Sequence, residues 1–147
     1  MFAFCPLGKI EVRLGLALAG GAAYVVRALE YANSVGAVSV SLCSNHGSPM
    51  EQVAKYAIVA DTGPEVITGS TRMKSGTAQK LVLNMISTGA MVKTGKVYEN
   101  MMINLRPTNK KLAERMVRIV CEIKGCEAAE AEALLAANEW NIRQAVQ

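Results

Sequence analysis

The chain has 147 residues, of which 51% are hydrophobic and 19% are charged, and its net charge is +4. This length fits about one globular domain with a small appendage, and the composition excludes a disordered tail. The cations are spread along the chain without long runs and only 5% of the residues are aromatic, so we expect no nucleic-acid partner.

The sequence gives no sign of a metal site or of a membrane span. His46 is the only histidine, and no two of the four cysteines form a CxxC pair (Cys5, Cys43, Cys121, Cys126). Free thiols are typical of a reducing cytoplasm, which we expect as the location. The apolar run of residues 14–26 is shorter than the roughly 20 residues of a membrane-spanning helix. It resembles a signal-peptide core, but it continues into an amphipathic pattern, which argues against secretion.

The first part of the chain alternates between strand and helix patterns. Apolar stretches predict strands at residues 12–18, 37–43 and 56–60, whereas residues 1–11 show no clear periodicity. Helical spacing predicts a helix between the first two strands that ends at Gly36, and Pro49 opens a short helix that ends at Val53. This alternation predicts parallel βαβ units with right-handed crossovers, and therefore an α/β fold.

The rest of the chain is predicted to be helical. We expect a long helix from Ser70 to about Lys93, a second that Thr108 caps and Gly125 ends, and short helices at 128–137 and 141–146. Pro107 interrupts this run, so we place a domain boundary between residues 1–106 and residues 107–147. One apolar face is expected on the first of these helices (Met73, Ala78, Leu81, Val82, Met85, Ile86, Val92).

The segment from Gly63 to Lys80 carries the strongest functional signal. It joins a glycine-punctuated turn, hydroxyls and two cations to the start of a helix, where free N–H groups and the helix dipole bind anions. The alternative is an ordinary helix cap with solvated cations. Glu65 could bind sugar hydroxyls, shuttle a proton or cap the following turn. The candidate ligand-binding residues here are Glu65, Thr68, Ser70, Thr71, Arg72 and Lys74.

Two other loops follow predicted strands and therefore reach the same edge of the sheet. Gly20 and Gly21 can approach a ligand closely, although backbone packing is the more common use of such glycines. Ser44 and Asn45 are either ligand contacts or turn formers. His46 has no visible partner, and we expect it to be an exposed turn residue.

These residues resemble a known family from Leu14 to the end of the chain. Residues 63–74 (GPEVITGSTRMK), 76–85 (GTAQKLVLNM), 94–98 (TGKVY) and 108–112 (TNKKL) resemble N-acetylmuramic acid 6-phosphate etherase, with glucokinase regulatory protein as a more distant relative. The resemblance implies an α/β/α sandwich of the SIS (sugar isomerase) type, followed by a small helical, UBA-like domain. It also implies cleavage of a lactyl ether with release of D-lactate, without metal or cofactor, by a cytoplasmic homodimer that recycles cell wall.

The chain departs from the family pattern in two ways. The resemblance implies that the first two strands and both catalytic glutamates would lie upstream of residue 1, so no catalytic residue is assigned. The family's phosphate loop reads Ser-Gly-Arg-Thr-Pro, whereas residues 19–23 read Ala-Gly-Gly-Ala-Ala. Each lost hydrogen bond to a charged group costs about 1.5–3 kcal/mol. We therefore expect weak sugar-phosphate binding at most, and no catalysis by this chain alone.

A sheet of only three parallel strands would expose a strand edge and an apolar helix face. We therefore expect self-association, as a two-fold dimer or a higher oligomer. Two other functions stay open: full etherase activity when the missing half is supplied, and a structural module without catalysis.

Overall fold

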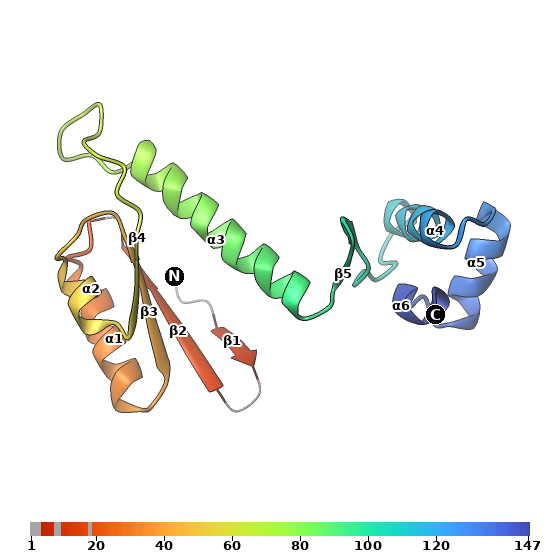
Figure 1. Ribbon diagram of the computed structural model, residues 1–147, viewed down its shortest axis with the longest axis horizontal. Helices are drawn as coiled ribbons and strands as arrows, with labels where there is room; N and C mark the ends of the chain where they lie inside the picture. The colour runs from red at the N-terminus through yellow and green to blue at the C-terminus, as the bar shows by residue number, and fades with distance from the viewer. Residues whose placement is uncertain (1–3, 8–9, 18) are drawn as a thin grey trace. The chain divides into compact units, whose positions relative to one another are not determined.

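The computed structural model describes residues 4–7, 10–17 and 19–147, and their side chains from residue 12 onward (Figure 1). The chain divides into two compact units, Met1–Met85 and Ile86–Gln147, and each is described by itself. This division falls inside a helix, and the domain boundary after residue 106 remains a prediction.

The first unit contains a four-stranded sheet with the order β1-β2-β3-β4. Strands β2 (Ile10–Leu16), β3 (Val38–Cys43) and β4 (Tyr56–Val59) are parallel, which confirms the predicted α/β fold with three parallel strands. Strand β1 (Phe4–Leu7) pairs antiparallel with β2 and was not predicted. Its sequence FCPL contains a proline, which an edge strand tolerates but which masks the strand pattern. The sequence predicted an exposed strand edge without saying which one, and the edge of β2 is covered by β1.

Two helices pack on one face of this sheet (Figure 1). Helix α1 (Ala23–Ser34) buries Val25 and Leu29, and the five-residue α2 (Pro49–Val53) follows β3. Gly15 of β2 allows the close approach of α1, because a Cβ there would lie 2.9 Å from Val25 and 3.0 Å from Leu29. Ser39 of β3 belongs to the same face, since its hydroxyl donates to the Asn33 side chain of α1 at 2.6 Å.

The opposite face of the sheet is apolar and incompletely covered. Side chains alternate between the two faces along a strand. The residues next to Gly15 and Ser39, and every second residue from them, therefore point to the other face. Of these, Leu42 is buried, whereas most are half-buried. The apolar residues of this face are Val12, Leu14, Leu16, Val38, Val40, Leu42 and Ile58. The sheet therefore has one well-covered face and one that is partly open.

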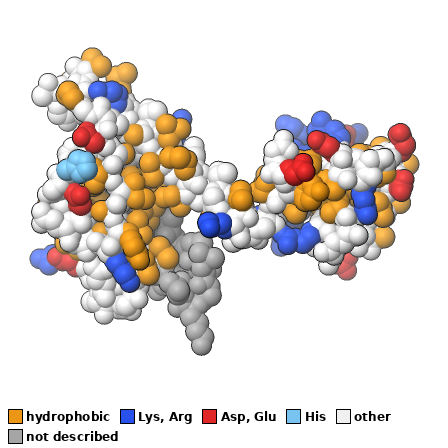
Figure 2. Space-filling view, in the orientation of Figure 1, with side chains coloured by type: hydrophobic (Ala, Val, Ile, Leu, Met, Phe, Trp, Pro, Cys, Tyr) orange, Lys and Arg blue, Asp and Glu red, His pale blue; other side chains and the backbone are white. Residues whose placement is uncertain are grey.

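Helix α3 (Lys74–Lys93) is shared by the two units. Its buried residues are Ser75 and Gln79, which are polar, whereas Leu81 is 51% exposed and Met85 is 64% exposed. The predicted apolar face of this helix is thus exposed, as expected for an incomplete sandwich. Figure 2 shows hydrophobic side chains gathered in a broad band on the visible side of the first unit.

The second unit combines a hairpin with three helices. The hairpin strands β5 (Val97–Tyr98) and β6 (Met101–Met102) were not predicted, because two-residue strands are too short for a periodic pattern. Helix α4 (Lys110–Lys124) is followed by α5 (Ala128–Ala137) and α6 (Ile142–Ala145), close to the predicted ranges. Their shared core consists mainly of Met116, Ile119, Val120, Ala131, Leu135 and Ile142.

The caps of α4 partly match the sequence prediction. Gly125 ends the helix in the left-handed region, with φ 66°, as predicted. The N-cap is Asn109 and not Thr108, because the Asn109 side chain accepts a hydrogen bond from the Leu112 N–H at 2.9 Å. Both residue types favour this position, so the sequence alone could not separate two adjacent candidates.

Candidate functional site

Three loops meet at the carboxyl edge of the parallel strands, where ligands bind in open α/β sheets. The loop after β2 is joined to the loop after β3, because the Asn45 side chain donates to the Ala19 carbonyl at 3.3 Å and the Met50 N–H donates to the Gly20 carbonyl at 3.2 Å. The third loop follows β4 and leads to α3. It is tied to the second through a hydrogen bond between the Ser44 and Ser75 hydroxyls, both of which are buried.

The two glycines of the first loop have different surroundings. Gly20 has φ 68°, and a Cβ there would lie only 2.5 Å from the Cβ of Ser48. Its backbone therefore packs directly against the next loop, which is the use that the sequence favoured. Gly21 is exposed, and a Cβ there would meet nothing within 4 Å. Ala22, the N-cap of α1, makes no side-chain capping bond.

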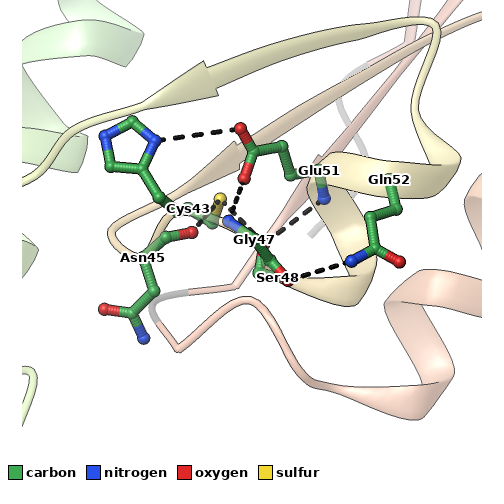
Figure 3. Close-up of polar contacts among 7 residues, drawn as sticks. Cys43, Asn45, Gly47, Ser48, Glu51 and Gln52 are labelled. Atoms are coloured by element: carbon green, nitrogen blue, oxygen red, sulfur yellow. Dashed lines mark hydrogen bonds and ion pairs between the residues drawn. The ribbon is translucent and has the colours of Figure 1, made fainter.

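The second loop is held by a polar network around the start of α2 (Figure 3). The Ser48 hydroxyl accepts from the Glu51 N–H at 3.3 Å and lies 3.3 Å from the Cys43 sulfur. The Glu51 carboxylate accepts from the N–H of Gly47, the residue before the N-cap Ser48, so the arrangement differs from a capping box, in which the carboxylate bonds the N–H of the N-cap itself. His46 is 70% exposed, as expected, but it does have a partner, since its Nδ1 lies 3.8 Å from the Glu51 carboxylate. Glu51 was not among the predicted residues, although the Ser-x-x-Glu spacing of residues 48–51 is typical of a helix N-terminus.

Glu65 occupies the helix N-terminus at which an external anion was predicted. Its carboxylate accepts from the Ser75 N–H at 3.1 Å and from the Lys74 N–H at 3.2 Å. The hydrogen bond from the Ser75 N–H is the main cause that lowers the pKa of Glu65 below its ordinary value. Desolvation of the carboxylate raises this pKa, whereas the N–H and the charge of Lys74 lower it further. The alternative in which Glu65 caps the following turn is therefore confirmed. It also explains why α3 begins at Lys74 and not at Ser70.

The remaining candidates of the third loop lie around this cap. Arg72 and Lys74 are exposed, as is Thr68, whereas Ser70 and Thr71 are half-buried. Lys74 also borders a mainly apolar hollow of about 780 Å³ (lined by Thr62, Met73, Lys74, Thr77, Ala78, Leu81). The site therefore offers two exposed cations, of which Lys74 borders the apolar hollow, while the helix N-terminus already holds the Glu65 carboxylate. A ligand role for the predicted residues of all three loops remains a prediction.

Two further observations concern the described residues only. No helix in this part of the chain is long and apolar enough to cross a membrane. No three or more His, Cys, Asp or Glu side chains there are grouped so that they could hold a metal ion.

Comparison with known proteins supports the resemblance. The chain is 48% identical over 139 residues to an N-acetylmuramic acid 6-phosphate etherase of Clostridium botulinum, which covers 95% of this chain and 46% of that protein. It is 49% identical over 136 residues to N-acetylmuramic acid 6-phosphate etherase 2 of Vibrio cholerae, with 92% and 44% covered. It is also 48% identical over 140 residues to the N-acetylmuramic acid 6-phosphate etherase of Oenococcus oeni, a match that covers 95% of this chain and 47% of that protein. No family model matches the chain.

The chain spans about half the length of the curated relatives that it matches. The predicted similarity to the etherases is therefore confirmed, and the coverage is consistent with a C-terminal part of such a protein. The fold agrees with this, because three parallel strands with flanking helices are consistent with a truncated SIS-type sandwich.

Proposed function

We propose that the chain retains one wall of a carbohydrate-phosphate site and binds amino-sugar phosphates weakly, without cleaving an ether by itself. The observation that carries this proposal is the 48% identity to proteins named as etherases, over a segment that includes all three loops at the carboxyl edge. From the same similarity we propose a role in cytoplasmic amino-sugar metabolism and in the recycling of cell wall.

The contacts of the third loop explain why binding should be weak. The helix N-terminus is neutralised by Glu65, so a phosphate group would depend on the exposed side chains of Arg72 and Lys74. The loop of residues 19–23 contributes no side-chain hydroxyl or cation. Exposed ion pairs each contribute only about 0–1 kcal/mol, so two of them supply about 2 kcal/mol at most, which corresponds to a dissociation constant of roughly 30 mM or weaker.

The same contacts argue against catalysis by the chain alone. Ether elimination needs a base to remove a proton and an acid for the leaving oxygen. Glu65 is a poor base, because both of its carboxylate oxygens accept backbone N–H groups and its pKa is lowered. A base with a depressed pKa has little affinity for the proton that it must take.

A second candidate function follows from the coverage of the relatives. With the missing half supplied by another polypeptide, the chain would form part of a complete etherase. We propose that the isolated chain self-associates as a dimer or higher oligomer, because the apolar residues of α3 are exposed to water.

Two measurements test the proposed function. Isothermal titration with N-acetylglucosamine 6-phosphate should give weak, saturable binding that is lost in Arg72→Ala and Lys74→Ala and kept in Lys124→Ala, an exposed cation of the second unit. Incubation with N-acetylmuramic acid 6-phosphate should release no D-lactate. Absence of binding, or equal binding by all three variants, would refute the sugar-phosphate site. Release of D-lactate would refute the claim that the chain is inactive alone.

A further inference from the structure

Two of the cysteines lie at the end of α4, where the helix cap brings their side chains together. Gly125 takes a left-handed φ of 66° and donates its N–H to the Cys121 carbonyl at 2.8 Å. In helix ends of this kind, the residue that follows the glycine commonly contacts the residue four positions before the glycine. Here these two residues are Cys126 and Cys121. The cap therefore places two thiols at positions whose side chains meet.

The surroundings of the two thiols agree with this placement. Both cysteines are free and half-buried, and both pack against the core of the second unit. The pKa of the Cys126 thiol is raised, first by desolvation, then by the charges of Glu130 and Cys121 and by a hydrogen bond with the Cys121 side chain. A disulfide needs Cβ atoms about 3.5–4.5 Å apart, so side chains within hydrogen-bond reach need little movement to form one.

We propose that Cys121 and Cys126 form a reversible oxidation site, at which a small-molecule disulfide such as oxidised glutathione closes an intramolecular disulfide. One thiolate attacks a sulfur of the oxidant, forms a mixed disulfide and releases one reduced glutathione. The other thiolate then attacks the chain's sulfur in that mixed disulfide and releases the second glutathione. The sulfur–sulfur bond of the oxidant breaks, one forms in the chain, and the two thiol protons end on the two glutathione thiols.

This site is separate from the proposed function, because it lies in the second unit and uses no sugar phosphate. The bond would tie the end of α4 to the start of α5, which begins at Ala128, two residues after Cys126. A bond that the folded chain favours must stabilise the fold to the same extent. We therefore expect thiols in a reducing cytoplasm, and a more stable second unit when the surroundings become oxidising.

Cys43 provides an internal control, because it is a free cysteine in a different setting. It is fully buried in the first unit, and its sulfur lies 3.3 Å from the Ser48 hydroxyl and 3.6 Å from the Asn45 carbonyl. These partners are oxygen atoms and not a thiol, so we expect Cys43 to stay reduced.

Peptide mapping tests the proposal. The folded chain is incubated with oxidised glutathione, quenched with acid, unfolded, blocked with N-ethylmaleimide and digested with trypsin, which cuts between the two cysteines at Lys124. We expect the peptides of residues 119–124 and 125–143 to be joined by a disulfide, and Cys43 to carry the blocking group. Non-reducing SDS electrophoresis should show the mass of a single chain.

Three variants and two comparisons sharpen this test. Cys121→Ser and Cys126→Ser should each keep glutathione on the remaining thiol of the pair, whereas Cys43→Ser should close the bond as the wild-type chain does. The equilibrium constant for closure should be about tenfold or more higher for the folded chain than for the chain in concentrated urea. The oxidised chain should also unfold at a higher urea concentration than the reduced chain, as followed by Trp140 fluorescence.

Four results would overturn the proposal: no linked peptide from the folded chain, a disulfide between two chains, oxidation of Cys43 in place of the pair, or closure that is equally favourable in urea. The wild-type chain carries all four readouts, so a variant that fails to fold does not decide the outcome.

Discussion

Replacement of Gly20 by alanine should destabilise the first unit far more than the same change at Gly21. Gly20 has φ 68°, where a residue with a side chain pays about 1–2 kcal/mol. The new Cβ would also lie 2.5 Å from Ser48 Cβ and 2.7 Å from its hydroxyl. Ser48 must then shift, and loss of its cap on α2 costs about 1 kcal/mol. We therefore expect Gly20→Ala to lower the free energy of unfolding of this unit by about 2–3 kcal/mol.

Gly21→Ala is the matched control, because its Cβ would meet nothing within 4 Å and its φ is not in the left-handed region. Its effect should be within about 0.5 kcal/mol, or slightly stabilising. Hydrogen–deuterium exchange of peptides from β2, β3 and α1 reports on the first unit. Fluorescence of Trp140, the single tryptophan, reports on the second unit and should not change. Equal stability of the two variants would refute the packing role assigned to Gly20.

Three further changes test other parts of the structure. Asn109→Ala should destabilise the second unit by about 1 kcal/mol in urea unfolding followed by Trp140 fluorescence, whereas Thr108→Ala should have little effect; the reverse order would show that Thr108 is the cap. Leu135→Ala should cost about 2–5 kcal/mol by the same assay, because this side chain is fully buried, and a loss below about 1 kcal/mol would contradict the described core. Glu65 has a lowered pKa, so its stabilisation of the start of α3 should be fully present above its ordinary pKa of 4.5 and should be lost as the pH falls through the lowered value. Glu65→Gln should remove that pH dependence in amide exchange at Ser75, and an unchanged profile would contradict the cap.

The parallel strands and most helix ends could be predicted from the sequence, because local patterns determine them. The alternation of apolar stretches with helical spacing predicted β3 and α1. The glycine at position 125 predicted the end of α4, because glycine readily takes the left-handed φ found there. Strand β1 and the hairpin β5–β6 could not be predicted. Both pair through backbone hydrogen bonds over two to four residues, which is too short for a side-chain pattern to form.

The candidate site was harder to predict than the fold, because its residues can serve either a ligand or the chain itself. Sequence reasoning placed Glu65 beside a cluster of hydroxyls and cations, but only the structure shows its carboxylate on the N–H groups of Lys74 and Ser75. The partner of Ser44 lies 31 residues away, on α3, and no local pattern could reveal it. Long-range contacts of this kind decide whether a polar loop is open to a ligand.

The proposed function requires the third loop to bind sugar phosphates weakly. The most direct test is an NMR titration of the ¹⁵N-labelled chain with N-acetylglucosamine 6-phosphate, with glucose as the uncharged control. We expect amide shifts concentrated between Glu65 and Ser75, with a dissociation constant of roughly 30 mM or weaker and no response to glucose. Shifts confined to other regions, or no shifts at saturating ligand, would contradict it.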